Sequence, residues 1–69
     1  MPLTYAQVGE RNTVRKIGGN SEIRKHLADL GFVNGADVTV ISETGGNLIV
    51  CVKETRVAIG RDMAVKIMI

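Results

Sequence analysis

The sequence predicts a mainly β domain: a small five-stranded barrel with a short helix inserted after the first strand and a one-turn helix before the last. Three observations support this fold class. Val and Ile dominate the apolar residues, and β-branched side chains favour strands. Glycines divide the chain into short segments, which is typical of all-β domains with tight turns. Only residues 21–30 repeat their apolar positions with the period of a helix.

The chain length and composition narrow the class of protein. With 69 residues, we expect residues 1–69 to form a single domain. The single cysteine, Cys51, rules out an internal disulfide. The first residues lack the basic start and apolar run of a signal peptide, and no segment approaches the ~20 apolar residues of a membrane span. We therefore expect a cytoplasmic protein.

The first part of the chain predicts a helical turn and a strand. Residues 4–7 can form one helical turn that Thr4 caps. Residues 12–17 are the first predicted strand, with Val14 and Ile17 pointing inward. The odd spacing of these two residues indicates a bulge or a bend within the strand.

The helix at residues 21–30 has one apolar stripe, formed by Ile23, Leu27 and Leu30. Asn20 or Ser21 can cap its first turn, because both side chains accept hydrogen bonds from backbone amides. Gly31 suits the left-handed residue that follows a helix, and Asn34-Gly35 predicts a tight turn.

The second half of the chain predicts the other four strands, at residues 37–42, 48–53, 56–59 and 65–69. In the first of these, Val38 and Val40 face one way while Thr39 and Ile41 face the other. A turn at residues 44–47 and a one-turn helix at residues 60–63, capped by Asp62, separate the strands. This order of elements predicts an SH3-like barrel, whose closure hides strand edges.

The polar residues form no recognisable catalytic pattern. His26 lies off the apolar stripe of the helix, where a solvated side chain is expected. Cys51 alternates with Ile49 in a strand, and we expect a buried, inert thiol. A metal site normally needs three or four ligands, and the chain has no second histidine. We therefore expect no catalytic residues, no metal site and no cofactor. A metal carrier or sensor that uses His26, Cys51 or a carboxylate is the alternative.

The net charge of +2 permits an anionic partner without requiring one. Five basic side chains can gather near the start of the helix: Arg11, Arg15, Lys16, Arg24 and Lys25. Barrels that bind single-stranded nucleic acid usually add stacking aromatic side chains, and this chain has only Tyr5 and Phe32. We therefore expect no nucleic acid partner, and a nucleic-acid-binding barrel is the less favoured alternative.

The corner after the helix is the better candidate for a contact surface. Leu30, Phe32 and Val33 cluster there, and a small barrel cannot easily bury all three. Packing of these residues in the protein's own core is the competing interpretation. The predicted docking surface comprises the following residues: Arg24, His26, Leu30, Phe32 and Val33. Apolar contact would supply its affinity, and its basic residues would steer the encounter.

Residues 26–40, HLADLGFVNGADVTV, resemble the FeoA family of bacterial ferrous iron uptake proteins. The resemblance lies in Leu30, Gly31, Phe32 and Gly35 and the alternating strand that follows. It extends to the rest of the chain at these positions: Leu3, Gly9, Val14, Ile17, Gly19, Ala64, Ile67 and Ile69. The chain departs from many members at Asn34, where they have Pro, and at His26, where they have Arg.

This resemblance implies an SH3-like accessory protein of the cytoplasm that docks on FeoB, the membrane ferrous iron transporter with a cytoplasmic GTPase-type domain, and modulates Fe²⁺ transport. It implies contact with the membrane only through that partner. A homodimer, formed through a strand edge or the apolar corner, is also possible. Members are often described as binding transition metals, but no set of ligands for Fe²⁺ or another metal is visible in the sequence.

Overall fold

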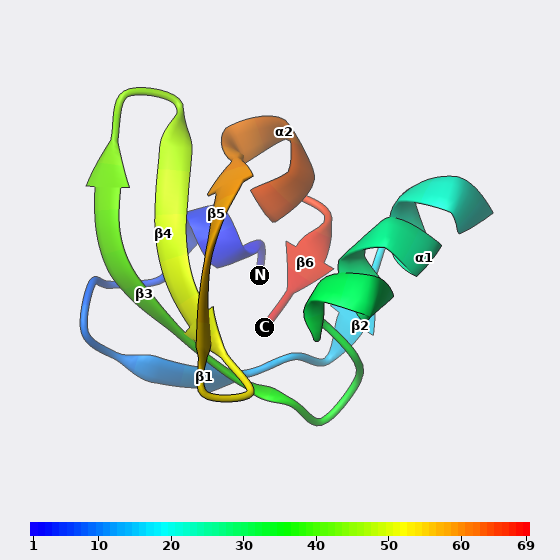
Figure 1. Ribbon diagram of the computed structural model, residues 1–69, viewed down its shortest axis with the longest axis horizontal. Helices are drawn as coiled ribbons and strands as arrows, with labels where there is room; N and C mark the ends of the chain where they lie inside the picture. Colours follow the sequence, from blue (N-terminus) through cyan, green and yellow to red (C-terminus); the bar gives the residue numbers. More distant parts are fainter.

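The computed structural model describes residues 1–69 as six strands, two α-helices and one 3₁₀ helix (Figure 1). In chain order these are η1 (Leu3–Tyr5), β1 (Arg11–Thr13), β2 (Lys16–Ile17), α1 (Ser21–Leu30), β3 (Asp37–Thr44), β4 (Asn47–Val52), β5 (Thr55–Gly60), α2 (Arg61–Ala64) and β6 (Ile67–Met68). The fold is mainly β, as predicted.

The strands form two antiparallel sheets. The larger sheet has the order β1-β3-β4-β5, and the smaller one pairs β2 with β6. A bridge between Pro2 and Met68 adds the start of the chain to the smaller sheet. The two chain ends therefore lie side by side (Figure 1), where the Met1 ammonium donates to an oxygen of Ile69 over 2.8 Å.

The single first strand predicted at residues 12–17 is two short strands, because the chain crosses between the sheets. The N–H of Val14 donates to the Ala36 carbonyl over 2.8 Å, next to the β1–β3 pair. The N–H of Arg15 donates instead to the Met68 carbonyl, next to the β2–β6 pair. The predicted bend is thus confirmed, and the strand count of five becomes six.

The last predicted strand, residues 65–69, is shorter than expected. The N–H of Val65 donates to Arg61 and that of Lys66 donates to Met63, so the turn of α2 extends over both residues. Only Ile67 and Met68 remain in β6.

The core contains alternate residues of the central strands. In β3 these are Val38 and Val40, and in β4 they are Leu48, Val50 and Val52. A register shift between Val40 and Ser42 bends β3 beyond this point. The other core side chains come from the remaining elements and loops: Leu3, Val14, Leu27, Phe32, Ile59, Ala64 and Ile67.

Helix α1 begins and ends as the sequence predicts. The Asn20 side chain accepts a hydrogen bond from the N–H of Ile23 over 2.9 Å. Gly31 has φ +110°, and the N–H of Phe32 donates back to the Leu27 carbonyl. The other two predicted caps are wrong. Pro2 precedes η1 and Gly60 precedes α2, and neither helix has a side-chain cap from Thr4 or Asp62.

Helix α1 lies at the side of the molecule, next to β2 and away from the larger sheet (Figure 1). This position leaves much of its surface uncovered: only Leu27 of the helix is fully buried. Neither α-helix is long and apolar enough to cross a membrane.

Candidate functional site

Helix α1 borders two open depressions, one on each side. The first, here called the basic groove, has a volume of about 400 Å³ and lies between α1, β2 and the corner after the helix. Its lining residues are Lys16, Ile17, Arg24, Ala28, Phe32, Val33 and Asn34. The charged side chains among them, Lys16 and Arg24, are both exposed, and no Asp or Glu lines the groove.

The floor of the basic groove is apolar and fixed. Phe32 is completely buried beneath it, and Ile17 and Val33 are half-buried. Backbone hydrogen bonds hold the corner in place: the N–H of Ala36 donates to the Val33 carbonyl over 3.0 Å, and the N–H of Gly35 donates to the Val14 carbonyl over 2.8 Å. The groove is therefore formed before any ligand arrives.

Lys16 also borders a neighbouring depression of about 380 Å³ with Met1, Arg15, Met68 and Ile69. No Asp or Glu side chain lines this depression either. The two depressions together therefore form one surface, on which Arg15, Lys16 and Arg24 surround apolar side chains.

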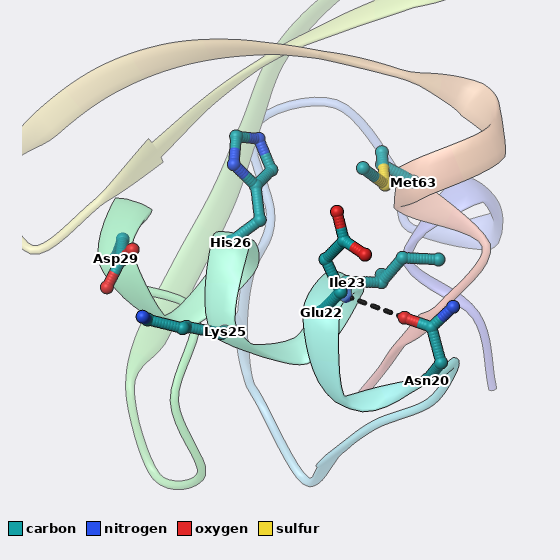
Figure 2. Close-up of a pocket in the computed structure, with 7 residues that line it drawn as sticks. All are labelled: Asn20, Glu22, Ile23, Lys25, His26, Asp29 and Met63. Atoms are coloured by element: carbon teal, nitrogen blue, oxygen red, sulfur yellow. Dashed lines mark hydrogen bonds between the residues drawn. The ribbon is translucent and has the colours of Figure 1, made fainter.

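The second depression along α1, here called the mixed groove, has a volume of about 550 Å³ and lies between α1 and α2. Figure 2 shows the Glu22 and His26 side chains on the side of α1 that faces Met63. The groove contains charges of both signs, from Glu22, Lys25 and Asp29. No three or more His, Cys, Asp or Glu side chains of the protein form a group that could hold a metal ion.

The structure divides the five predicted docking residues between these regions. Arg24, Phe32 and Val33 meet at the basic groove. His26 lies in the mixed groove, and the half-buried Leu30 lines neither groove. Phe32 requires a correction. It is 0% exposed, because the turn at Gly31 directs it beneath the helix into the core, so it forms the floor of the groove and not an exposed contact residue.

Of the five basic residues expected to gather, Arg15, Lys16 and Arg24 do so. Arg11 lies in β1, beside a depression that it shares with Asp37 and Glu54. Lys25 lies in the mixed groove, because one residue further along a helix turns the side chain by about 100°.

The predicted burial of Cys51 is also wrong. Its alternation with Ile49 is as expected, but Val50 and Val52 occupy the core face of β4. Cys51 therefore lies half-exposed on the outer face of the sheet, opposite Thr39 and Arg56.

Some residues of the basic groove are not among the predicted docking residues. Ala28 follows Arg24 by four residues, so helical spacing alone could have placed both on one face. Ile17 packs against the core, as predicted, and also lines the groove, where the basic Lys16 lies beside it. The positions of Ile17 and Lys16 in the groove depend on the pairing of β2 with β6 in the smaller sheet, which no local pattern indicates.

Comparisons with known proteins agree with this fold over the full chain. The family model described as "FeoA domain" matches residues 1–69. Fe(2+) transport protein A of Methanocaldococcus jannaschii is 35% identical over 68 residues, which cover 99% of this chain and 83% of that protein.

Solved structures give the same result. A crystal structure of the iron uptake regulatory protein FeoA has a TM-score of 0.90 and 32% identity, over 99% of this chain and 92% of that chain. The FeoA of Stenotrophomonas maltophilia, described as an SH3 domain protein complexed with zinc, has a TM-score of 0.86 and 27% identity, over 99% of this chain and 87% of that chain. This chain therefore belongs to the FeoA family, the small proteins of ferrous iron transport.

Proposed function

We propose that this protein is a non-enzymatic accessory protein of ferrous iron transport that docks on the cytoplasmic part of the FeoB transporter and modulates Fe²⁺ uptake. The observation that supports this proposal is the basic groove, a preformed apolar recess with cations at its rim on a FeoA domain. Such a recess suits the binding of another protein, because apolar anchors in a pocket supply most of the affinity at interfaces.

The proposal places the protein in the cytoplasm, bound to the membrane only through its partner. It gives the protein no catalytic role, because the effect on transport would follow from binding alone. It also assigns no resident metal, because Glu22, His26 and Asp29 of the mixed groove form no group that could hold a metal ion. Self-association through β5, an outer strand of the larger sheet, is a separate prediction.

Two measurements test this function. The first is capture of the purified cytoplasmic part of FeoB from the same organism by the purified protein. The second is Fe²⁺ uptake by cells that contain the transporter, with and without this protein. We expect capture and a changed rate of uptake. An absence of capture together with an identical rate per transporter would contradict the proposal.

A pair of matched variants locates the contact. Val33→Asp places a charge on the floor of the basic groove, whereas Val65→Asp places the same charge at an exposed position outside it. We expect Val33→Asp alone to weaken capture, provided that its circular dichroism shows a folded protein. Equal capture by both folded variants would exclude the basic groove as the docking site.

A further inference from the structure

The basic groove also indicates what kind of segment it recognises. We propose that it binds an acidic segment of the partner, with an apolar side chain seated on the floor and flanking carboxylates paired with Lys16 and Arg24. This inference rests on the proposed function, because it specifies the chemistry of the same docking event. Three features of the structure support it: the distribution of charge, the shape of the floor and the position of the aromatic rings.

The charged side chains that border this surface are all positive. The chain has nine basic and seven acidic side chains, and Arg15, Lys16 and Arg24 border the basic groove and its neighbour. None of the seven acidic side chains lines either depression. Unpaired charges of one sign around a recess attract a partner of the opposite sign.

Arg24 in particular has no internal partner. The positions three and four residues away on α1 hold Asn20, Ser21, Leu27 and Ala28, none of them acidic. The only salt bridge of the structure joins Arg61 to Glu43, 2.7 Å apart and away from this groove. The Arg24 guanidinium is therefore free to pair with a carboxylate from outside, and its planar donors suit that group.

The shape of the groove favours a peptide over a membrane. The apolar side chains Ile17 and Val33 lie in a recess above the buried Phe32. A protein that binds a lipid surface inserts protruding apolar side chains instead. A recess of about 400 Å³ accepts a side chain of Leu, Ile, Met or Phe size.

The positions of the aromatic rings argue against nucleic acid. Single-stranded nucleic acid is held by bases that stack on exposed rings beside the cations. The Phe32 ring is 0% exposed, and the exposed Tyr5 lies in η1 and lines none of the depressions. The cations of the basic groove therefore lack a stacking platform.

The test uses the full chain and a set of overlapping synthetic 15-residue peptides that covers the cytoplasmic segments of FeoB from the same organism. Binding is measured by fluorescence anisotropy at low and at high salt. We expect the bound peptides to be net negative and to contain at least one large apolar residue. Their affinity should fall at high salt, because screening weakens the exposed ion pairs.

Two charge reversals on the same helix form the matched pair. Arg24→Glu should weaken peptide binding by about tenfold, since it repels the carboxylates. Lys25→Glu changes the net charge equally but lies in the mixed groove, so binding should change by less than about twofold. Both residues are exposed, so both variants should fold, and circular dichroism checks this.

Several outcomes would overturn the inference: bound peptides that are neutral or basic, equal effects of the two reversals, or tighter, Arg24-dependent binding of an oligo-dT strand or of phosphatidylserine vesicles. Failure of the proposed function looks different. In that case the wild-type protein would not capture the intact cytoplasmic part of FeoB at all. If the Arg24→Glu variant still captured FeoB, only the inference of an acidic segment would be contradicted, and the proposed docking on FeoB would stand.

Discussion

The basic groove and the mixed groove border the same helix, yet their charges are arranged in opposite ways. In the mixed groove, Lys25 lies three residues after Glu22 and four before Asp29, so charges of both signs share one face. In the basic groove, Arg24 has no acidic residue at either spacing. A shift of one residue along α1 thus separates a face with charges of both signs from a face with positive side-chain charge alone.

The floors of the two grooves differ as well. Phe32 lies beneath the basic groove and is completely buried, whereas Ile23 and Met63 beside the mixed groove are half-buried. An enclosed aromatic ring fixes the shape of its surroundings, while a methionine adapts to them. One side of α1 therefore has a rigid floor, and the other side has an adaptable one.

The largest expected effect is a difference in stability between substitutions in the floors of the two grooves. Phe32→Ala should lower the free energy of unfolding by about 3–5 kcal/mol, because it removes a fully buried ring from the core. Met63→Ala should cost about 1–2 kcal/mol, since that side chain is already partly in water. Urea denaturation measures both. Equal losses would show that the mixed groove has a floor as well packed as that of the basic groove.

Gly31 joins the helix to the corner of the basic groove. Its φ of +110° is strained for any residue with a Cβ, although the nearest atoms to an added Cβ are at an ordinary 3.6 Å. Gly31→Ala should therefore lower the free energy of unfolding by about 2 kcal/mol through the backbone alone.

Gly46→Ala is the control for this variant, because an added Cβ meets no atom within 4 Å and no positive φ is required there. Its stability should be unchanged or slightly raised. Equal urea midpoints for the two glycine variants would mean that the turn after α1 tolerates another conformation.

The cap at Asn20 affects the end of α1 that lies in the mixed groove. Asn20→Ala removes the hydrogen bond to the N–H of Ile23 and should cost about 1 kcal/mol. Ser21→Ala is the matched control, since the Ser21 side chain makes no hydrogen bond in the structure. Thermal unfolding should place the Asn20 variant clearly below the control. If both melt together, the cap contributes nothing to stability.

The smallest expected effect concerns metal ions in the mixed groove. Zinc or ferrous ion titrated into the protein at micromolar concentration should give no saturable heat, because Glu22, His26 and Asp29 form no group that could hold a metal ion. A saturable heat that disappears in His26→Ala would reveal a metal site. Such a site would also make the mixed groove, and not the basic groove, the functional side of α1.

Several features that depend on neighbouring residues were predictable, although the caps expected from Thr4 and Asp62 are absent. The cap at Asn20, the left-handed Gly31 and the alternation of Val38 and Val40 all arise from interactions within a few positions. Features that depend on distant parts of the chain were not. The division of the first strand follows from hydrogen bonds to Ala36 and Met68, and the exposure of Cys51 depends on which face of β4 meets the core.

The candidate site shows the same division. The sequence indicates an apolar cluster of Leu30, Phe32 and Val33, whereas the structure buries Phe32 in the core and leaves Leu30 outside both grooves. This burial was not predictable, because a one-residue difference in a turn decides which side chain enters the core. Arg24 and Ala28 share a helical face by sequence spacing. Lys16 lies beside them only because the chain crosses from β1 in the larger sheet to β2 in the smaller sheet.

By itself, the sequence determined the mainly β class, the position and ends of the one long helix, and the kinship with the FeoA family. These depend on short-range geometry and on the order of residues along the chain. Only the tertiary structure decided that Phe32 is a floor and not a contact, and that Lys16 and Arg24 share a recess without a carboxylate. Burial and charge pairing arise between segments far apart in the chain, and folding alone brings those segments together.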